Sequence, residues 1–96
     1  MQTVYEQTIQ EQTVQQKTEE IYYRFGNSVR VVRRAHNWTQ AQLASRAGMN
    51  KTYLVRIEAG DKNLTLKTAQ RIAVALDMEL ITLLKGVKIT IEQDQV

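Results

Sequence analysis

The side chains that could do chemistry in this chain are chiefly cationic. Residues 24–88 contain twelve lysines and arginines but only four acids, a net charge of +8, whereas the first 23 residues carry −3 and the last eight carry −2. Neutralising phosphates with such cations releases counterions, so a basic segment of this kind favours binding to a polyanion. A basic surface that meets only solvent is the alternative interpretation.

Catalytic and metal chemistry have little support in the residue types. The sequence offers no nucleophile paired with a base, no glycine-rich phosphate loop and no carboxylate pair in a plausible cleft, so we expect no enzyme and no catalytic residues. There is no cysteine, and the single histidine, His36, has no acidic cluster beside it. We therefore expect no metal and no cofactor, with His36 a surface residue of a loop.

The length and hydropathy of the chain predict one small domain. Its 96 residues are 43% hydrophobic, yet no apolar run approaches the roughly 18 residues that a membrane-spanning helix needs. The Gln- and Thr-rich amino terminus lacks the apolar segment of a signal peptide. We expect a cytoplasmic protein with no membrane partner.

The elements that would position the cations lie in residues 39–60. This stretch is predicted to form two short amphipathic helices that meet at Gly48, where a residue without Cβ adopts a left-handed backbone freely. The apolar or small residues fall where two crossing helices bury side chains against each other: Leu43, Ala44, Ala47, Met49, Leu54 and Ile57. The pattern is typical of a helix-turn-helix, whose second helix is presented to a groove of DNA.

Five helices in all are predicted. The first runs from about residue 21 or 22 to 35, is weakened by Gly26, and places Tyr22, Phe25, Val29 and Val32 on one face. Trp38 is expected to pack back into the core. Thr39 with Gln42 forms a capping-box pattern for a second helix over 40–47, and Asn50 caps a third that ends near residue 59.

A fourth helix is expected to follow its N-cap Thr65. Its core positions are Leu66, Ala69, Ile72, Ala73 and Leu76. A fifth helix over residues 78–84 has more apolar residues than one face requires.

Both ends of the chain lie outside this pattern. Residues 1–22 repeat Thr every five residues, a period that builds no continuous apolar face, and predict a flexible or frayed tail that becomes helical only as an extension of the next helix. After Gly86, residues Val87, Ile89 and Ile91 alternate with polar residues and predict a short strand, which needs a partner strand, most simply from a second subunit. A frayed end is the alternative.

The residue pattern over 25–84 resembles one known family. The signature Trp38-Thr39-Gln40-Ala41-Gln42-Leu43-Ala44, followed by Gly48 and residues 49–60, is similar to the Cro and C1 repressor-like (Xre) helix-turn-helix proteins, and most of all to restriction-modification controller proteins. The resemblance implies an all-α, five-helix lambda-repressor-like DNA-binding domain over residues 22–85. The polar tail predicted at 1–21 and the dimerising strand and tail predicted at 86–96 lie outside the resemblance and follow from residue patterning alone.

The resemblance also implies roles for individual residues. Gln40 matches a glutamine that contacts the DNA backbone and buttresses the reading helix, and Thr39 can offer its hydroxyl or N–H to a phosphate. Lys51, Thr52 and Arg56 match positions that face the major-groove floor, where Lys51 or Arg56 can bond guanine O6 and N7. The secondary candidates are Asn50, Tyr53 and Val55, with Lys62 and Asn63 in a backbone-contacting turn. Tyr53 is the weakest of these, because an aromatic ring prefers burial.

One structural pair also follows from the same resemblance. Arg33 and Glu58 match a structural ion pair between the first and third helices, which we interpret as a brace for the fold and, as a partly exposed pair, a minor contribution to stability. Residue patterning, rather than the resemblance, predicts the dimerisation residues, which come from the surplus apolar positions of the fifth helix and from the alternating strand: Leu80, Leu83, Leu84, Val87, Ile89 and Ile91.

The favoured function is a sequence-specific regulator of transcription that binds double-stranded DNA as a homodimer on a pseudo-palindromic operator. The first alternative is an antitoxin that also represses its own operon and holds a toxin with its tail or strand. The second is a protein-interaction module that keeps the fold without binding DNA.

Overall fold

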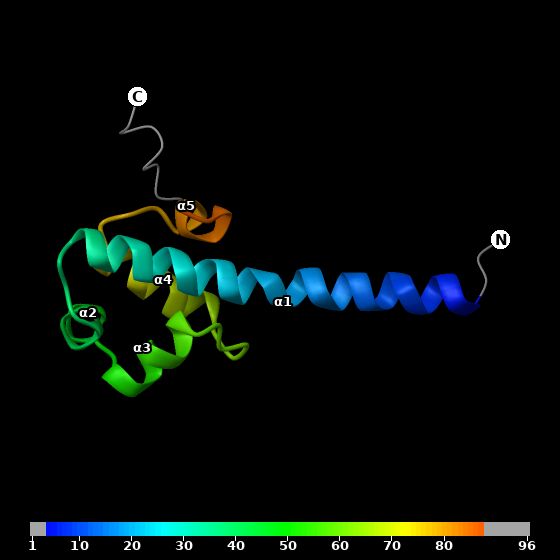
Figure 1. The fold of residues 1–96 in the computed structure, drawn as a ribbon. Helices are drawn as coiled ribbons and strands as arrows, with labels where there is room; N and C mark the ends of the chain where they lie inside the picture. Colours follow the sequence, from blue (N-terminus) through cyan, green and yellow to red (C-terminus); the bar gives the residue numbers. More distant parts are fainter. Residues whose placement is uncertain (1–3, 88–96) are drawn as a thin grey trace, which may run out of the picture.

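Five helices make up the described part of the molecule. The structure is a computed structural model that describes residues 4–87, with side chains from residue 13 onward. The helices are α1 (Val4–Ala35), α2 (Gln40–Ala47), α3 (Lys51–Glu58), α4 (Leu66–Ala75) and α5 (Leu80–Lys85), arranged as in Figure 1. All five predicted helices are present, and residues 4–87 contain no strand. The predicted strand lies, apart from Val87, outside the described residues.

The first helix starts far earlier than predicted. α1 has 32 residues and is about 48 Å long at the usual rise per residue. The predicted start at residue 21 or 22 was wrong. The prediction that the tail becomes helical as an extension of this helix is confirmed for residues 4–20. Glutamine and glutamate are good helix formers, which lets the backbone continue without an apolar face.

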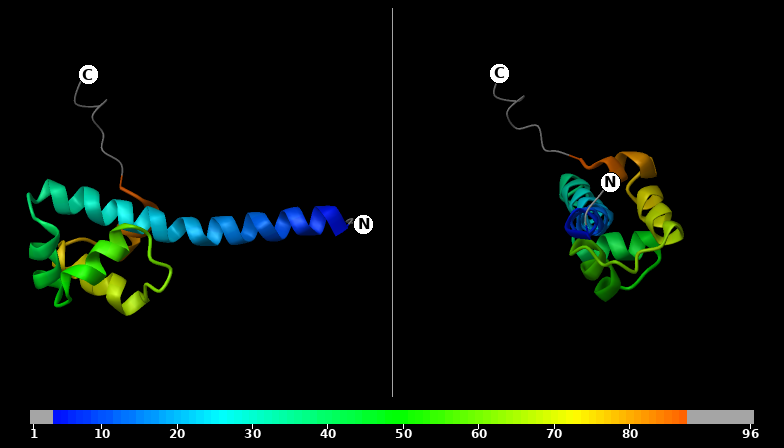
Figure 2. Two further views of the ribbon diagram at one scale, coloured as in Figure 1. Left: turned by 60° about the horizontal axis from the view of Figure 1, so that its bottom comes forward. Right: turned by 90° about the vertical axis from the view of Figure 1, so that its right-hand side faces the viewer.

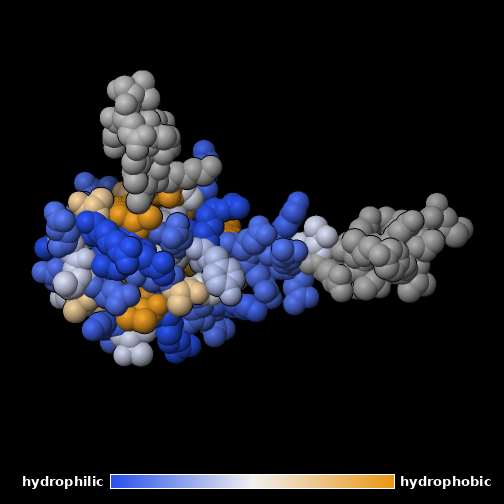
Figure 3. Space-filling model, viewed as in Figure 1, coloured by the Kyte–Doolittle hydropathy of each residue, from blue (hydrophilic) through white to orange (hydrophobic). Residues whose placement is uncertain are grey.

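Residues 4–20, which we name the arm, project from the rest of the molecule. The views in Figures 1 and 2 show this part of α1 clear of the other helices. All side chains from residue 13 to 18 are exposed, Val14 by 66%. In Figure 3 the coloured surface where α1 leaves the body is mostly hydrophilic. Residues 13–18 of the arm therefore gain little from packing.

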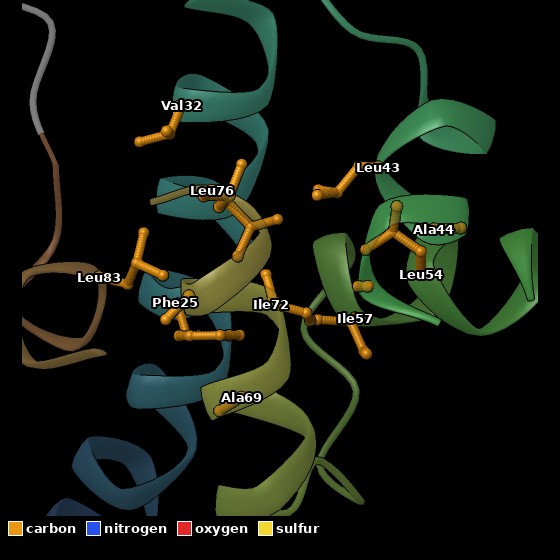
Figure 4. Packing of buried hydrophobic residues seen from close by; sticks show 13 residues of the cluster. Phe25, Val32, Leu43, Ala44, Leu54, Ile57, Ala69, Ile72, Leu76 and Leu83 are labelled. Carbon is orange, nitrogen blue, oxygen red and sulfur yellow. The ribbon is translucent and has the colours of Figure 1, made fainter. Parts of the chain in front are cut away.

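The core is built from side chains of all five helices. Figure 4 shows Phe25 and Val32 of α1 facing Leu83 of α5 and Leu76 of α4, with α2 and α3 closing the other side. The buried apolar side chains are Phe25, Val29, Val32, Leu43, Ala44, Ala47, Leu54, Ile57, Ala69, Ile72, Ala73, Leu76 and Leu83. The prediction that Leu66 lies in the core was wrong, because this residue, the first of α4, is 75% exposed.

Gly26 marks the closest approach of α1 to α3. A Cβ at this position would lie 2.8 Å from the carbonyl oxygen of Glu58 and closer still to that of Ile57. Backbone oxygens cannot move aside as the end of a side chain can. The glycine that the sequence presents as a weak point in α1 is therefore the residue that lets α3 pack against it.

No helix within residues 4–87 is both long enough and apolar enough to cross a membrane.

Candidate nucleic-acid interface

The turn between α2 and α3 is fixed by the residues that the sequence places there. Gly48 has φ 69° and ends α2, and the N–H of Met49 donates to the carbonyl of Ala44 at 2.9 Å. Ala44 is only 2% exposed and belongs to the hydrophobic core. A guanidinium nitrogen of Arg71 on α4 donates to the carbonyl of Gly48 from outside the turn. These contacts hold α3 at one angle to α2.

The first turn of α2 is closed by a capping box. The hydroxyl of Thr39 accepts from the N–H of Gln42 at 3.1 Å, and the Gln42 side chain accepts from the N–H of Thr39 at 2.8 Å. The N–H of Thr39, which was expected to be available to a phosphate, is thus used within the protein. Its hydroxyl keeps its own proton as a donor.

One face of α3 is exposed and carries polar side chains. Asn50 caps the helix by accepting the N–H of Tyr53 at 2.8 Å. Leu54, Ile57 and Glu58 are buried. Because a helix repeats every 3.6 residues, the opposite face, which points outward, comprises the first two residues of α3 and the fifth and sixth. The exposed residues are Lys51, Thr52, Val55 and Arg56. Tyr53 is half-buried against the core, as the preference of its ring for burial indicates.

The inner face of α3 is held by a buried ion pair. Arg33 of α1 donates to both carboxylate oxygens of Glu58, at 2.7 Å to Oε2 and 3.0 Å to Oε1. The two side chains are 9% and 1% exposed, so the expectation of a partly exposed pair was wrong. Replacing either partner leaves the other charge buried and unpaired, which costs far more than loss of a surface pair.

Two further side chains complete this network. Gln40 donates its amide to Glu58 Oε1 at 3.0 Å, which connects the first turn of α2 to α3. Arg30 donates to the carbonyl oxygen of Glu58 at 2.9 Å, near the end of α3. Residues of α1 and α2 thus hold one carboxylate and the adjoining peptide of α3. The network fixes the rotation of α3 about its own axis.

The loop after α3 brings acidic and basic residues together. Asp61 Oδ2 lies 3.2 Å from a guanidinium nitrogen of Arg56, and Asp61 Oδ1 accepts the N–H of Asn63 at 2.9 Å. The ammonium of Lys62 donates to Glu19 at 2.9 Å, where the arm meets the body. This hydrogen bond, with a second one from Gln15, holds the pKa of Glu19 below its ordinary value, and the same bond raises the pKa of Lys62.

The structure divides the residues expected at a dimer interface. Leu83 is fully buried in the core, so its assignment to a subunit contact was wrong. Leu80, Leu84 and Val87 are half-buried against the same core, and Ile89 and Ile91 lie outside the described residues. Ile81, which we did not predict, is the apolar side chain that α5 exposes, by 57%. A short helix that is apolar on every side does not reveal which side faces inward.

Some residues of this region carry no local sequence signal. Arg71 acts through a contact with Gly48, 23 residues earlier in the chain, and Asp61 acts through the turn that brings it back to Arg56. His36 stacks on the Trp38 ring, with centroids 4.3 Å apart, and its Nε2 lies 3.3 Å from the carbonyl oxygen of Leu76. Arg46 covers the same ring at 4.2 Å. Of these, only the Trp38 ring had been expected to pack, and it is half-buried against the core.

Comparison with known proteins agrees with this geometry. A helix-turn-helix family model matches residues 29–83, which is more than half of the chain. The control protein C.SmaI of Serratia marcescens is 37% identical over 57 residues, or 59% of this chain and 68% of that protein. The immunity repressor protein of Bacillus phage phi105 is 30% identical over 70 residues, or 73% of this chain. The chain spans about half, 48%, of that repressor.

Solved structures extend the agreement to three dimensions. The crystal structure of the restriction-modification controller protein C.AhdI from Aeromonas hydrophila superposes with a TM-score of 0.62 at 32% identity, covering 65% of this chain and 94% of that one. The hypothetical transcription factor NHTF from Neisseria has a TM-score of 0.66 at 22% identity, covering 82% and 88%, a likeness of fold alone. From its sequence match and its α2–α3 geometry together, this chain belongs to the Cro/C1-type helix-turn-helix family of DNA-binding proteins.

Proposed function

We propose that the protein is a sequence-specific regulator of transcription whose helix α3 enters the major groove of double-stranded DNA. The observation that carries this proposal is the division of α3 into two faces. Lys51, Thr52 and Arg56 are exposed on the outer face, while Glu58 on the inner face is buried in a network of hydrogen bonds from α1 and α2. A helix fixed in this way presents its donors at a constant orientation, which base recognition requires.

Each polar residue near α3 has a proposed task. Lys51 and Arg56 bond guanine O6 and N7, Thr52 contacts a thymine methyl or a phosphate, and Asn50 and Val55 contribute beside them. Backbone phosphates are contacted by the hydroxyl of Thr39, by Gln40, and by Lys62 and Asn63 in the loop after α3. Tyr53 contributes through the exposed part of its ring. The domain that carries these contacts comprises residues 22–85.

We further propose that two copies act together on a pseudo-palindromic operator. A single α3 of eight residues meets too few bases to select a site, whereas two copies about 34 Å apart read successive major grooves on one face of the duplex. The exposed Ile81 of α5, with half-buried Leu80 and Leu84 beside it, supplies apolar surface for the second subunit. The relatives are named as control and repressor proteins, so the antitoxin alternative has no support.

Selection of binding sites from random duplexes, followed by titration of the purified variants, tests the DNA-reading role. Arg56→Ala should weaken binding to the selected site by about 1–3 kcal/mol and relax discrimination at one base pair. Arg34→Ala is the matched control, because it removes an equal charge from an exposed position in the last turn of α1, outside α3. It should weaken binding to selected and random duplexes by the same small factor.

Two results would contradict the proposal. The first is that no sequence is enriched over successive rounds of selection. The second is that Arg56→Ala weakens binding to the selected and random duplexes equally. Sedimentation of the protein with and without a duplex carrying one selected site measures the number of chains bound, which should be two.

A further inference from the structure

Asp61 is held more firmly than a residue of an exposed turn needs to be. Its Oδ1 accepts the N–H of Asn63 at 2.9 Å, and its own N–H donates to the carbonyl of Arg56 at 3.1 Å. Its Oδ2 is inaccessible to solvent and accepts no hydrogen bond within residues 4–87. The charge that faces this oxygen is the guanidinium of Arg56, at 3.2 Å.

Among the described side chains, residues 13–87, Asp61 is the one that pairs with the guanidinium of Arg56. The Arg56 side chain is 61% exposed on the outer face of α3, while the carboxylate that it contacts is 8% exposed. A guanidinium has five N–H donors in a rigid plane, so contact with one carboxylate oxygen leaves other donors for a second partner. The restraint also lowers the conformational entropy of the Arg56 side chain before binding. Less of that entropy then has to be lost when the side chain binds a base.

We propose that Asp61 is a positioning residue that orients the guanidinium of Arg56 for bidentate recognition of a guanine. The inference rests on the proposed function, because it specifies how one of the base contacts is made selective. Asp61 also places a negative charge beside the DNA, which opposes binding to phosphates of any sequence. Asp61 therefore lowers the affinity for DNA of any sequence and raises the discrimination between sequences. A residue with a purely structural role would not change these two quantities in opposite directions.

Asp61→Asn is the sharpest variant for this test. The amide oxygen still accepts the N–H of Asn63 and preserves the turn, but the negative charge that attracts Arg56 is removed. We expect Asp61→Asn to bind random duplexes more tightly than the wild type, with a steeper dependence on salt concentration. The ratio of the affinities for the selected site and for the same site with the guanine replaced should fall by about fivefold. This is a part of the discrimination that a complete bidentate contact supplies.

A double-mutant cycle with Arg56→Ala shows whether the effect passes through Arg56. In the Arg56→Ala background, Asp61→Asn should leave discrimination at that base unchanged while it still strengthens general binding. Far-UV circular dichroism and thermal unfolding establish that each variant is folded. If Asp61→Asn does not fold, Asp61→Ser, whose hydroxyl can also accept the N–H of the turn, replaces it in the same cycle.

The outcomes separate this inference from the proposed function. If the wild type selects no sequence, the proposed function fails before any Asp61 variant is measured. If Arg56→Ala alone leaves discrimination intact, the proposed base-reading role of Arg56 fails as well. If the wild type selects a site and Arg56→Ala reduces discrimination, the inference is overturned when Asp61→Asn retains wild-type discrimination or when its loss persists in the Arg56→Ala background. Equal weakening on selected and random duplexes by Asp61→Asn also overturns it, because that result indicates a structural role.

Discussion

The two halves of α1 share one continuous backbone but differ in what stabilises them. Residues 21–35 bury Phe25, Val29 and Val32 and, at Gly26, lie against the backbone of α3. The arm exposes every side chain from residue 13 to 18. Tertiary packing stabilises residues 21–35. The arm depends on the helix-forming tendency of Gln and Glu, which gives only marginal helix stability in water. Helical geometry alone therefore does not indicate equal stability.

Each half also contributes an ion pair to the α3 region, Arg33–Glu58 from the packed half and Glu19–Lys62 from the arm, and these two pairs differ in the same way. The Arg33–Glu58 pair is buried and bidentate, with Gln40 as a third partner. In the Glu19–Lys62 pair the side chains are 33% and 57% exposed. Solvent screens the second pair and is excluded from the first. The contrast gives three predictions, in decreasing order of expected effect.

Glu58→Ala should lower the free energy of unfolding by about 3–5 kcal/mol, because Arg33 would remain buried without its counter-charge. Chemical denaturation followed by circular dichroism measures this change. Glu20→Ala, which removes an exposed acid from the arm, is the control and should stay close to the wild type. A loss below about 1 kcal/mol for Glu58→Ala would show that the network does not depend on its carboxylate.

Proline substitution at two exposed positions of α1 compares the halves directly. Asn27→Pro breaks the packed half and should reduce the free energy of unfolding by about 3 kcal/mol or more. Gln16→Pro should leave the unfolding midpoint nearly unchanged and remove only the helical circular dichroism of the residues before it. Equal destabilisation by the two variants would mean that the arm unfolds together with the body.

The smallest expected effect concerns the pH dependence of the arm contact. Because the pKa of Glu19 is lowered by Lys62, its stabilising contribution is present above the ordinary pKa of a glutamate and is lost as pH falls through the lowered value. The raised pKa of Lys62 gives the converse limit, with loss as pH rises through that value. Between these limits the contribution is constant. Lys62→Gln should raise the pKa of Glu19, which a carboxyl-detected NMR titration measures, and an unchanged value would exclude the contact in solution.

The sequence predicts those features that depend on neighbouring residues. Thr39, Asn50 and Thr65 cap their helices through bonds to the residue three positions ahead, so their types and spacing are sufficient. The start of α1 was missed because the arm has no apolar face from which periodicity can be read. Leu83 was misplaced because α5 is apolar on several sides and only the assembled core selects the inner one.

Contacts between separate elements are less accessible to sequence reasoning. Glu19 and Lys62 are 43 residues apart, and the contact between Arg56 and Asp61 depends on how the chain turns at Gly60, whose φ is 97°. The outward face of α3 could be anticipated from its periodicity and the family resemblance. The partners that orient its side chains could not, because they follow from the packed arrangement of α1, α3 and the loop.

The caps at both ends of the α2–α3 turn affect the thermodynamics of complex formation. A peptide of eight residues such as α3 would be largely unfolded in water, yet its Asn50 cap, its C-terminal hydrogen bonds and its buried face order it within the folded domain. If α3 binds DNA as proposed, little conformational entropy remains to be lost at the protein surface. The heat-capacity change of binding, measured by calorimetry, would then be set by the surface area that is buried when two rigid partners dock. Coupled folding would add nothing to it.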